Sequence, residues 1–244
     1  RSYGFKIEKE NQKIGLLETD YLEINTNVPD KSLGMVRSML AKSLKTQYGL
    51  PIADKYRIRI EPSNDLNTTE VYLTLTSIGE VVKGEQILWQ PRLKDVELET
   101  EMLLTLMVFL GSERSDAIAN IQSDNTIDEA NVSVENTESF YASLLFPHDK
   151  KKTWTYLGWA LDELNIDIDD RDSSEGSYFI KVTPNKGFFT RFLNTASSTK
   201  IYQLIVKEVD GVSTYVYFVD LSEENEKDTI TYSFELFNKI ASKF

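Results

Sequence analysis

Five carboxylates between positions 167 and 175 give this chain its densest group of potential metal ligands: Asp167, Asp169, Asp170, Asp172 and Glu175. Carboxylate oxygens at such close spacing are the ligands that Ca²⁺ prefers. However, Gly176 stands at the wrong step for an EF-hand loop, and no bidentate acid follows at the required distance. Alternation along a strand also directs Asp167 and Asp169 away from the face of Ile166 and Ile168. We therefore expect a solvated strand and turn, and no metal site.

Other groups that could perform catalysis are sparse. The chain has a single histidine, His148, and no cysteine, which excludes disulfides, thiolate metal sites and a cysteine nucleophile. No glycine-rich phosphate loop, GxSxG elbow or HExxH motif occurs. We therefore expect no enzymatic activity, no catalytic residue and no cofactor.

The acidic turn belongs to a segment that occurs twice. Residues 4–21, GFKIEKENQKIGLLETDY, align without a gap with residues 165–182, NIDIDDRDSSEGSYFIKV, at a constant spacing of 161 positions. Apolar residues alternate with polar ones in both copies, and Gly15 aligns with Gly176. Each copy is therefore predicted to be a strand, a polar turn that closes on glycine, and a second strand. The chain contains two copies of one unit.

The charge distribution limits the classes of partner and suggests a boundary. The net charge is −12, and the longest basic run is residues 150–152, so repulsion from phosphate makes nucleic acid an unsuitable partner. No apolar run approaches the ~18–20 residues that a membrane-spanning helix needs. Residues 114–136 hold one basic and five acidic residues and no aromatic residue, which predicts a flexible acidic linker. The alternative for part of this segment is a frayed helix, because Ile118, Ile121 and Ala130 recur at loosely helical spacing.

These patterns predict an α+β protein with two tandem domains, residues 1–113 and 137–244, each an antiparallel sheet packed against helices. In the second domain, Asp149 begins a helix through residue 164, and Asp210 and Gly211 turn a hairpin. A closing helix follows from about Asp228, with a predicted apolar stripe of Ile230, Phe234, Phe237, Ala241 and Phe244. The first domain repeats this order without its opening helix, and adds a helix at residues 32–45.

The closing helix of the first domain, residues 95–111, is apolar on nearly every side between residues 102 and 110. Such a helix must be covered on both faces. The cover is either the sheet together with the helix at residues 32–45, or a partner protein on one side. Gly111 stands where a glycine that ends a helix is expected.

A candidate partner surface lies on the helix at residues 150–164. Tyr156, Trp159 and Glu163 fall on the side opposite to Trp154, Leu157, Leu161 and Leu164. A tryptophan and a tyrosine on an exposed helix face are typical of an interaction hot spot. The alternative is that both rings pack under the linker or against the first domain.

Several passages together resemble the BamC family, also called the NlpB or lipoprotein-34 family. The specific ones are WQPRLKDVELETEMLLTLMVFLG, from residue 89, and DRDSSEGSYFI, from residue 170. Weaker support comes from KIGLLETDYLE, KYRIRIE and TTEVYLTLTSIGE. The residues that carry the resemblance, for which we expect structural roles, are Trp89, Gln90, Pro91, Arg92, Arg171, Asp172 and Gly176.

The resemblance implies a non-enzymatic scaffold subunit of the machinery that assembles β-barrel proteins in the Gram-negative outer membrane. It implies two helix-grip domains, and partners that include BamD and BamA. It also implies an outer-membrane location through a lipidated N-terminal segment that is absent from this chain, on either the periplasmic or the cell-surface side. The alternative function is a periplasmic carrier that binds an apolar ligand or peptide in a helix-grip groove. Large side chains such as Tyr178, Tyr217 and Phe234 are expected to fill that groove.

Overall fold

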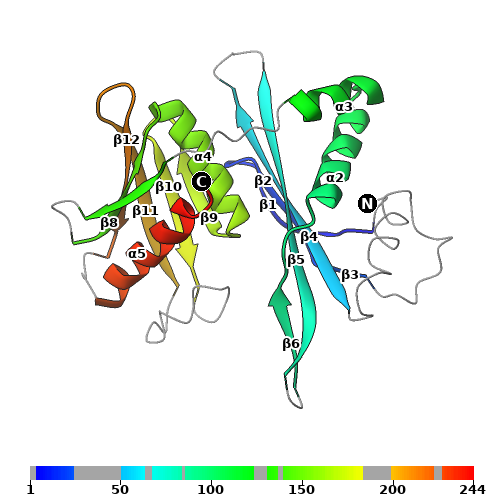
Figure 1. The fold of residues 1–244 in the computed structure, drawn as a ribbon, viewed down its shortest axis with the longest axis horizontal. Helices are drawn as coiled ribbons and strands as arrows, with labels where there is room; N and C mark the ends of the chain where they lie inside the picture. The colour runs from blue at the N-terminus through cyan, green and yellow to red at the C-terminus, as the bar shows by residue number, and fades with distance from the viewer. Residues whose placement is uncertain are drawn as a thin grey trace. The chain divides into compact units, whose positions relative to one another are not determined.

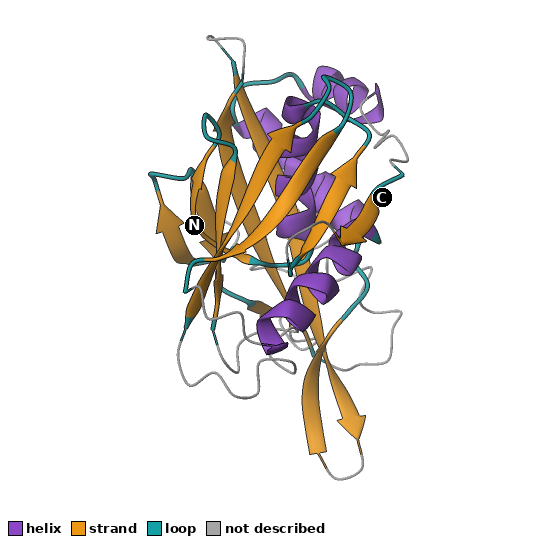
Figure 2. Cartoon of the chain, turned by 90° about the vertical axis from the view of Figure 1, so that its left-hand side faces the viewer, coloured by secondary structure: helices purple, strands orange, loops and turns teal. Residues whose placement is uncertain are grey.

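The computed structural model describes residues 4–24, 51–63, 68–83, 86–123, 131–136, 140–183, 199–222 and 227–244. Within these ranges the protein is α+β, with two antiparallel sheets and four helices (Figures 1 and 2). The chain divides into two compact units, Arg1–Asn125 and Thr126–Phe244. Among the described residues, each unit contains one six-stranded sheet and two helices.

The sheet of the first unit follows the predicted repeat. Its strand order is β1 (Ile7–Asn11), β2 (Leu16–Thr19), β4 (Ile52–Pro62), β5 (Thr69–Lys83) and β6 (Gln86–Pro91), and β3 (Leu22–Ile24) also pairs with β4. The first part of β5 pairs with β4 and the last part pairs with β6. The β5–β6 hairpin therefore continues beyond the end of β4 (Figure 2). Neither β3 nor β6 was predicted.

Helix α2 (Val96–Phe109) covers one face of this sheet. Its Leu98 is buried against Tyr56 and Leu75, and Phe5, Leu73 and Met102 pack around these three residues. Asp95 caps the helix by accepting a hydrogen bond from the amide of Leu98 at 3.1 Å. At the other end, Gly111 has a φ of +109°, and the amides of Gly111 and Ser112 donate to the carbonyls of Val108 and Met107. The predicted helix-ending glycine is thus confirmed.

The apolar run of α2 is covered only in part. Leu98 and Leu104 are buried, whereas Phe109 is 83% exposed and Leu110 is 67% exposed. The predicted helix at residues 32–45 lies outside the described residues. Helix α3 (Arg114–Ser123) packs against α2 and buries Ala117 completely.

The expected linker at residues 114–136 contains regular structure at both ends. Residues 114–123 form α3, and β7 (Ser133–Asn136) pairs with the next strand of the second unit. The boundary between the two units falls between Asn125 and Thr126. Helix α3 includes Ile118 and Ile121, on which the helical alternative rested, whereas β7 was missed because Val134 is the only apolar residue among its four.

The second sheet has the order β7, β8 (Ala142–Phe146), β12 (Thr214–Asp220), β11 (Lys200–Glu208), β10 (Ser177–Val182) and β9 (Asp167–Asp172). Helices α4 (Lys150–Glu163) and α5 (Lys227–Ala241) cover the same face of it. Trp154 of α4 stacks on Tyr178 at 4.0 Å, and Phe237 of α5 meets Phe218 at 6.2 Å. Asp210 and Gly211 form the predicted turn between β11 and β12.

The apolar stripe predicted for the closing helix was wrong in phase, except at Phe237, which is buried as predicted. The buried residues of α5 are Thr229, Tyr232, Ser233, Leu236, Phe237 and Ile240. Phe234 and Ile230 lie beside this stripe and are only half-buried. The helix also ends at Ala241, so Phe244 lies beyond it. Counting large apolar side chains misplaced the stripe because Thr229 and Ser233, both small and polar, are completely buried on this side of the helix.

The two copies share their first hairpin and differ at the far side of the sheet. The turns β1–β2 and β9–β10 close on Gly15 and Gly176, with φ of +60° and +72°. In the first sheet the strand beyond β5 is β6, which follows it in sequence. In the second sheet the place beyond β12 belongs to β8, which precedes α4.

Candidate partner-binding surface

Helix α4 positions the predicted surface residues. Asp149 caps its start by accepting a hydrogen bond from the amide of Lys152 at 2.8 Å. Trp154, Leu157 and Leu161 are buried on the side facing the sheet, as predicted. The hydroxyl of Tyr178 donates to the carbonyl of Trp154 at 3.4 Å, which ties the helix to β10. This packing fixes which side of α4 faces outward.

Tyr156, Trp159 and Glu163 share the outward side of α4, and all three are half-buried. Part of their cover is Phe244. Its ring stacks on Tyr156 at 5.4 Å, meets Trp159 at 5.5 Å with the planes inclined by 63°, and meets Phe146 edge-on at 5.4 Å. Three rings, from Phe146, Tyr156 and Trp159, thus surround the ring of Phe244; we call these three rings the aromatic niche.

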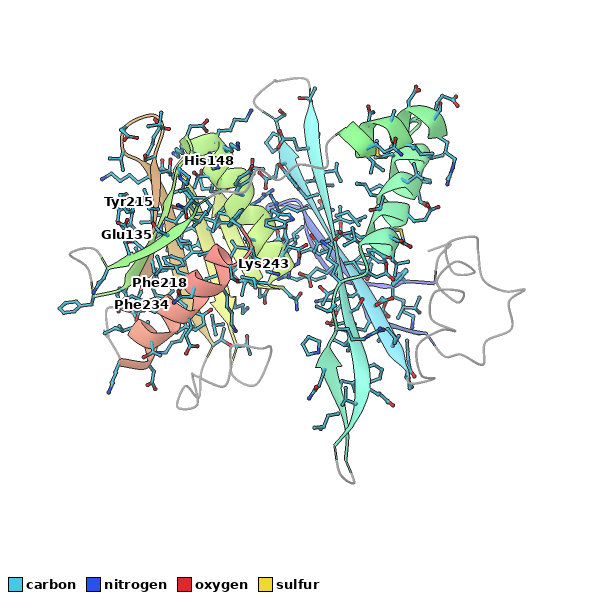
Figure 3. All side chains as sticks on the ribbon, viewed as in Figure 1. Glu135, His148, Tyr215, Phe218, Phe234 and Lys243 are labelled. Atoms are coloured by element: carbon cyan, nitrogen blue, oxygen red, sulfur yellow. The ribbon has the colours of Figure 1, made fainter. Side chains whose placement is uncertain are left out.

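Charged groups flank the aromatic niche on both sides. The Nζ atom of Lys243 lies 4.0 Å from the Oε2 atom of Glu163. Figure 3 shows Lys243 at the end of α5 that lies beside α4. On the other side, the Nζ atom of Lys152 lies 5.4 Å from the ring centre of Tyr156, and the ring of His148 meets Tyr156 edge-on at 5.3 Å. The carbonyl of His148 accepts a hydrogen bond from the hydroxyl of Thr214 at 2.8 Å, which fixes this residue against β12.

The structure brings the three predicted residues together and adds two that the sequence analysis missed. Phe244 was predicted in the stripe of the closing helix, and Phe146 was not assigned a role. The sequence signal for Phe244 was its helical spacing from Phe237 and Ala241. Such a signal does not show which neighbouring element the ring will contact.

The first block of family-signature residues joins β6 to α2. Trp89, Gln90 and Pro91 lie on β6, and the ring of Trp89 is 42% exposed. The amide of Arg92 donates to the carbonyl of Ser77 at 3.0 Å. The side chain of Arg92 crosses Gly79 so closely that a Cβ there would lie 2.6 Å from the Cδ atom of Arg92. These contacts hold the chain against β5 before the helix begins.

The second block shapes the turn between β9 and β10. One carboxylate oxygen of Asp172 accepts hydrogen bonds from the amide of Ser174 at 2.9 Å, its hydroxyl at 2.6 Å and the amide of Glu175 at 3.1 Å. Arg171 precedes this turn on β9 and pairs with Tyr178 across the sheet. Gly176 closes the turn at positive φ. The carboxylate of Asp172 therefore accepts hydrogen bonds from residues of the same turn and stabilises its conformation.

Comparison with known proteins identifies the family. Residues 135–243 match the family described as the outer membrane protein assembly factor BamC-like C-terminal domain. A protein of Accumulibacter regalis named outer membrane protein assembly factor BamC is 31% identical over 227 residues, which is 86% of this chain and 58% of that protein. Proteins with the same name from Thiobacillus denitrificans and Shewanella sediminis are 34% and 23% identical, over 73% and 94% of this chain. The chain covers 47% and 61% of those two relatives.

The second unit thus belongs to a class of α+β domains in which two helices cover one face of a six-stranded antiparallel sheet. With the relatives that match both units, the chain as a whole belongs to the BamC family. The described helices include none that is long and apolar enough to cross a membrane.

Proposed function

We propose that this chain acts as a non-enzymatic binding subunit of the complex that assembles β-barrel proteins in the outer membrane. The observation that carries this proposal is the match of residues 135–243 to the BamC-like C-terminal domain, together with relatives named as outer membrane protein assembly factors. The chain spans about half to three-fifths of the length of these relatives. Attachment to the outer membrane through a lipidated N-terminal segment is part of the proposal.

The side of α4 that bears Tyr156, Trp159 and Glu163 is the proposed contact with another subunit, BamD or BamA. Its rings form a layer outside the completely buried core residues Leu157 and Leu161. Tryptophan and tyrosine in such a layer supply large contact areas at little cost in side-chain entropy. The helix-grip description is supported by the way α4 and α5 lie on one face of the second sheet.

The carrier alternative receives less support from the packing. Between the second sheet and α5, Tyr202, Phe218 and Tyr232 lie with neighbouring ring centres 4.9 to 6.1 Å apart, and each is at most 3% exposed. Rings packed this closely fill the space that an apolar ligand would need. We therefore favour the binding subunit.

The test is reconstitution from purified components. The chain is mixed with BamD, with BamA, and with both, and each mixture is separated by size-exclusion chromatography. The proposal expects co-elution with at least one of the subunits. Separate elution in all three mixtures would show that the described units do not carry the contact.

A further inference from the structure

Residues 243 and 244, which follow the end of α5, make two kinds of contact with α4 and β8: Phe244 occupies the aromatic niche, and Lys243 pairs with Glu163 beside it. The ring of Phe244 lies among Phe146, Tyr156 and Trp159, and its centre is 5.4 to 5.5 Å from the centre of each of these rings. The ammonium group of the preceding Lys243 lies 4.0 Å from the carboxylate of Glu163. The surface on α4 and β8 is thus complementary to a basic residue followed by an aromatic one.

We propose that the aromatic niche recognises a partner segment in which a basic residue precedes an aromatic residue, and that Lys243 and Phe244 occupy the niche until that segment displaces them. The inference rests on the proposed function, because it specifies the partner chemistry and the regulation of the same surface. The contacts of Lys243 and Phe244 indicate what the partner segment must contain. It needs an aromatic ring to contact the three rings of the niche and a cation to pair with Glu163.

The seated segment is held by weak contacts. Residues 242–244 lie beyond the end of α5, and the amides of Lys243 and Phe244 donate to the carbonyls of Ile240 and Ala241 at 3.0 and 3.2 Å. The last turn of a helix opens more readily than its middle. The Lys243 side chain is 32% exposed, so its ion pair with Glu163 is weakened by solvent.

Release of Phe244 would uncover the three rings on a rigid base. Trp154 and Leu157, on the inner side of α4, are 8% and 0% exposed, so we expect them to remain packed on the sheet when Phe244 is released. The rings of Tyr156 and Trp159 would then present an aromatic pair without a change in the core. A competing segment must overcome a tethered occupant whose effective concentration is on the order of millimolar.

The experiment measures competition between the seated residues and an added copy of them. The probe is an acetylated, amidated peptide with the sequence of residues 238–244, NKIASKF. It is titrated into the ¹⁵N-labelled chain while the indole N–H resonance of Trp159 is followed. We expect the peptide to bind the Phe244→Ala variant about tenfold more tightly than the unaltered chain, which is the change that results if Phe244 occupies the niche about nine-tenths of the time.

Two controls test the roles of the aromatic ring and of Lys243. A peptide that ends in alanine instead of phenylalanine should leave the indole resonance unchanged. Lys243→Glu places a second acid beside Glu163 and should also strengthen binding of the probe, which provides a test that keeps Phe244 if Phe244→Ala fails to fold. Equal affinity of the probe for the unaltered chain and both variants overturns the inference, as does the absence of any indole shift in Phe244→Ala.

The result is separable from the test of the proposed function. If BamD or BamA binds the chain but Phe244→Ala does not change the affinity for the probe, displacement is wrong and the proposed function stands. If neither subunit binds but the probe shows the expected competition, the chemistry of the niche is supported and the assembly role is wrong.

Discussion

The carbonyl oxygen of Gly176 accepts a hydrogen bond from the amide of Val206 at 2.7 Å. In the first copy, 161 positions earlier, the carbonyl of Gly15 accepts the equivalent bond from the amide of Ile60 at 2.8 Å. Each glycine therefore joins the first hairpin of its unit to the next strand. At Gly176 the approach is so close that a Cβ would lie 2.7 Å from the carbonyl oxygen of Val206 and 2.8 Å from the Cε atom of Lys150.

Gly176→Ala should therefore destabilise the second unit by about 2–3 kcal/mol, because it combines an unfavourable positive φ with a backbone collision. The matched control is Gly211→Ala. Gly211 has a similar φ of +77°, but the nearest atom to its Cβ lies 3.9 Å away, so we expect a loss of about 1 kcal/mol. Urea unfolding followed by fluorescence of Trp154 and Trp159 measures both. Equal losses would contradict the role assigned to the contact.

Asn165 ends α4 in the left-handed conformation, with a φ of +53°. Its amide donates to the carbonyl of Asp162, and the next amide, of Ile166, donates to Leu161. Asn165→Gly should maintain or slightly raise stability, whereas Asn165→Ala should lower it by about 1 kcal/mol, because alanine tolerates this φ least. Thermal unfolding of the three proteins checks the order. Alanine equal to glycine at this position would show that the φ imposes no constraint.

Burial raises the pKa of the Asp54 carboxyl above its ordinary value of 3.8, although the Ser77 hydroxyl, which donates to it at 2.5 Å, and the Arg92 charge act to lower it. A raised pKa means that the folded state binds the proton more tightly than the unfolded state. The contribution of Asp54 to stability is thus fully present below pH 3.8 and is lost as the pH rises through the raised value.

The Asp54→Asn variant should consequently match or exceed the unaltered chain in stability at pH 7 and lose this advantage at pH 4. Differential scanning calorimetry of both proteins from pH 4 to 8 gives the difference directly, and the titration of every other group cancels in the comparison. A difference that stays constant over this range would mean that Asp54 titrates at its ordinary pKa in the folded protein.

The elements with regular periodicity were predictable from the sequence. The glycine-closed hairpins, the turn at Asp210 and Gly211, and the caps at Asp149 and Gly111 all appear where local chemistry placed them. Strand β8 was missed because Ala142, Leu144 and Phe146 are buried on one side while Ser143 is also buried on the other, so no alternation of apolar and polar residues marks it. Strand β6 was missed because Pro91 in its last position is unusual for a strand.

The candidate surface could be predicted only in part. Helical spacing placed Tyr156, Trp159 and Glu163 on one side of α4, because that spacing depends on the helix alone. The contact with Phe244 joins residues about 85 positions apart, and it depends on how α5 ends and crosses beside α4. The spacing of residues within one helix does not show where a second helix, distant in the sequence, will pack.

The central claim is that the outward side of α4 is a contact surface for the assembly complex. Because Tyr156 and Trp159 both contact Phe244, their replacement by alanine should lower the melting temperature slightly, and binding must be measured below the transition. Phe140→Ala is the matched control, since Phe140 is 73% exposed in the same unit and also loses an aromatic ring.

The most direct measurement is the dissociation constant of the immobilised chain for the subunit that co-elutes with it, BamD or BamA, by biolayer interferometry. We predict that Trp159→Ala weakens binding by about tenfold or more, as loss of an aromatic anchor does at interaction hot spots, while Phe140→Ala leaves it unchanged. Affinity of Trp159→Ala equal to that of the unaltered chain would contradict the assignment of this surface.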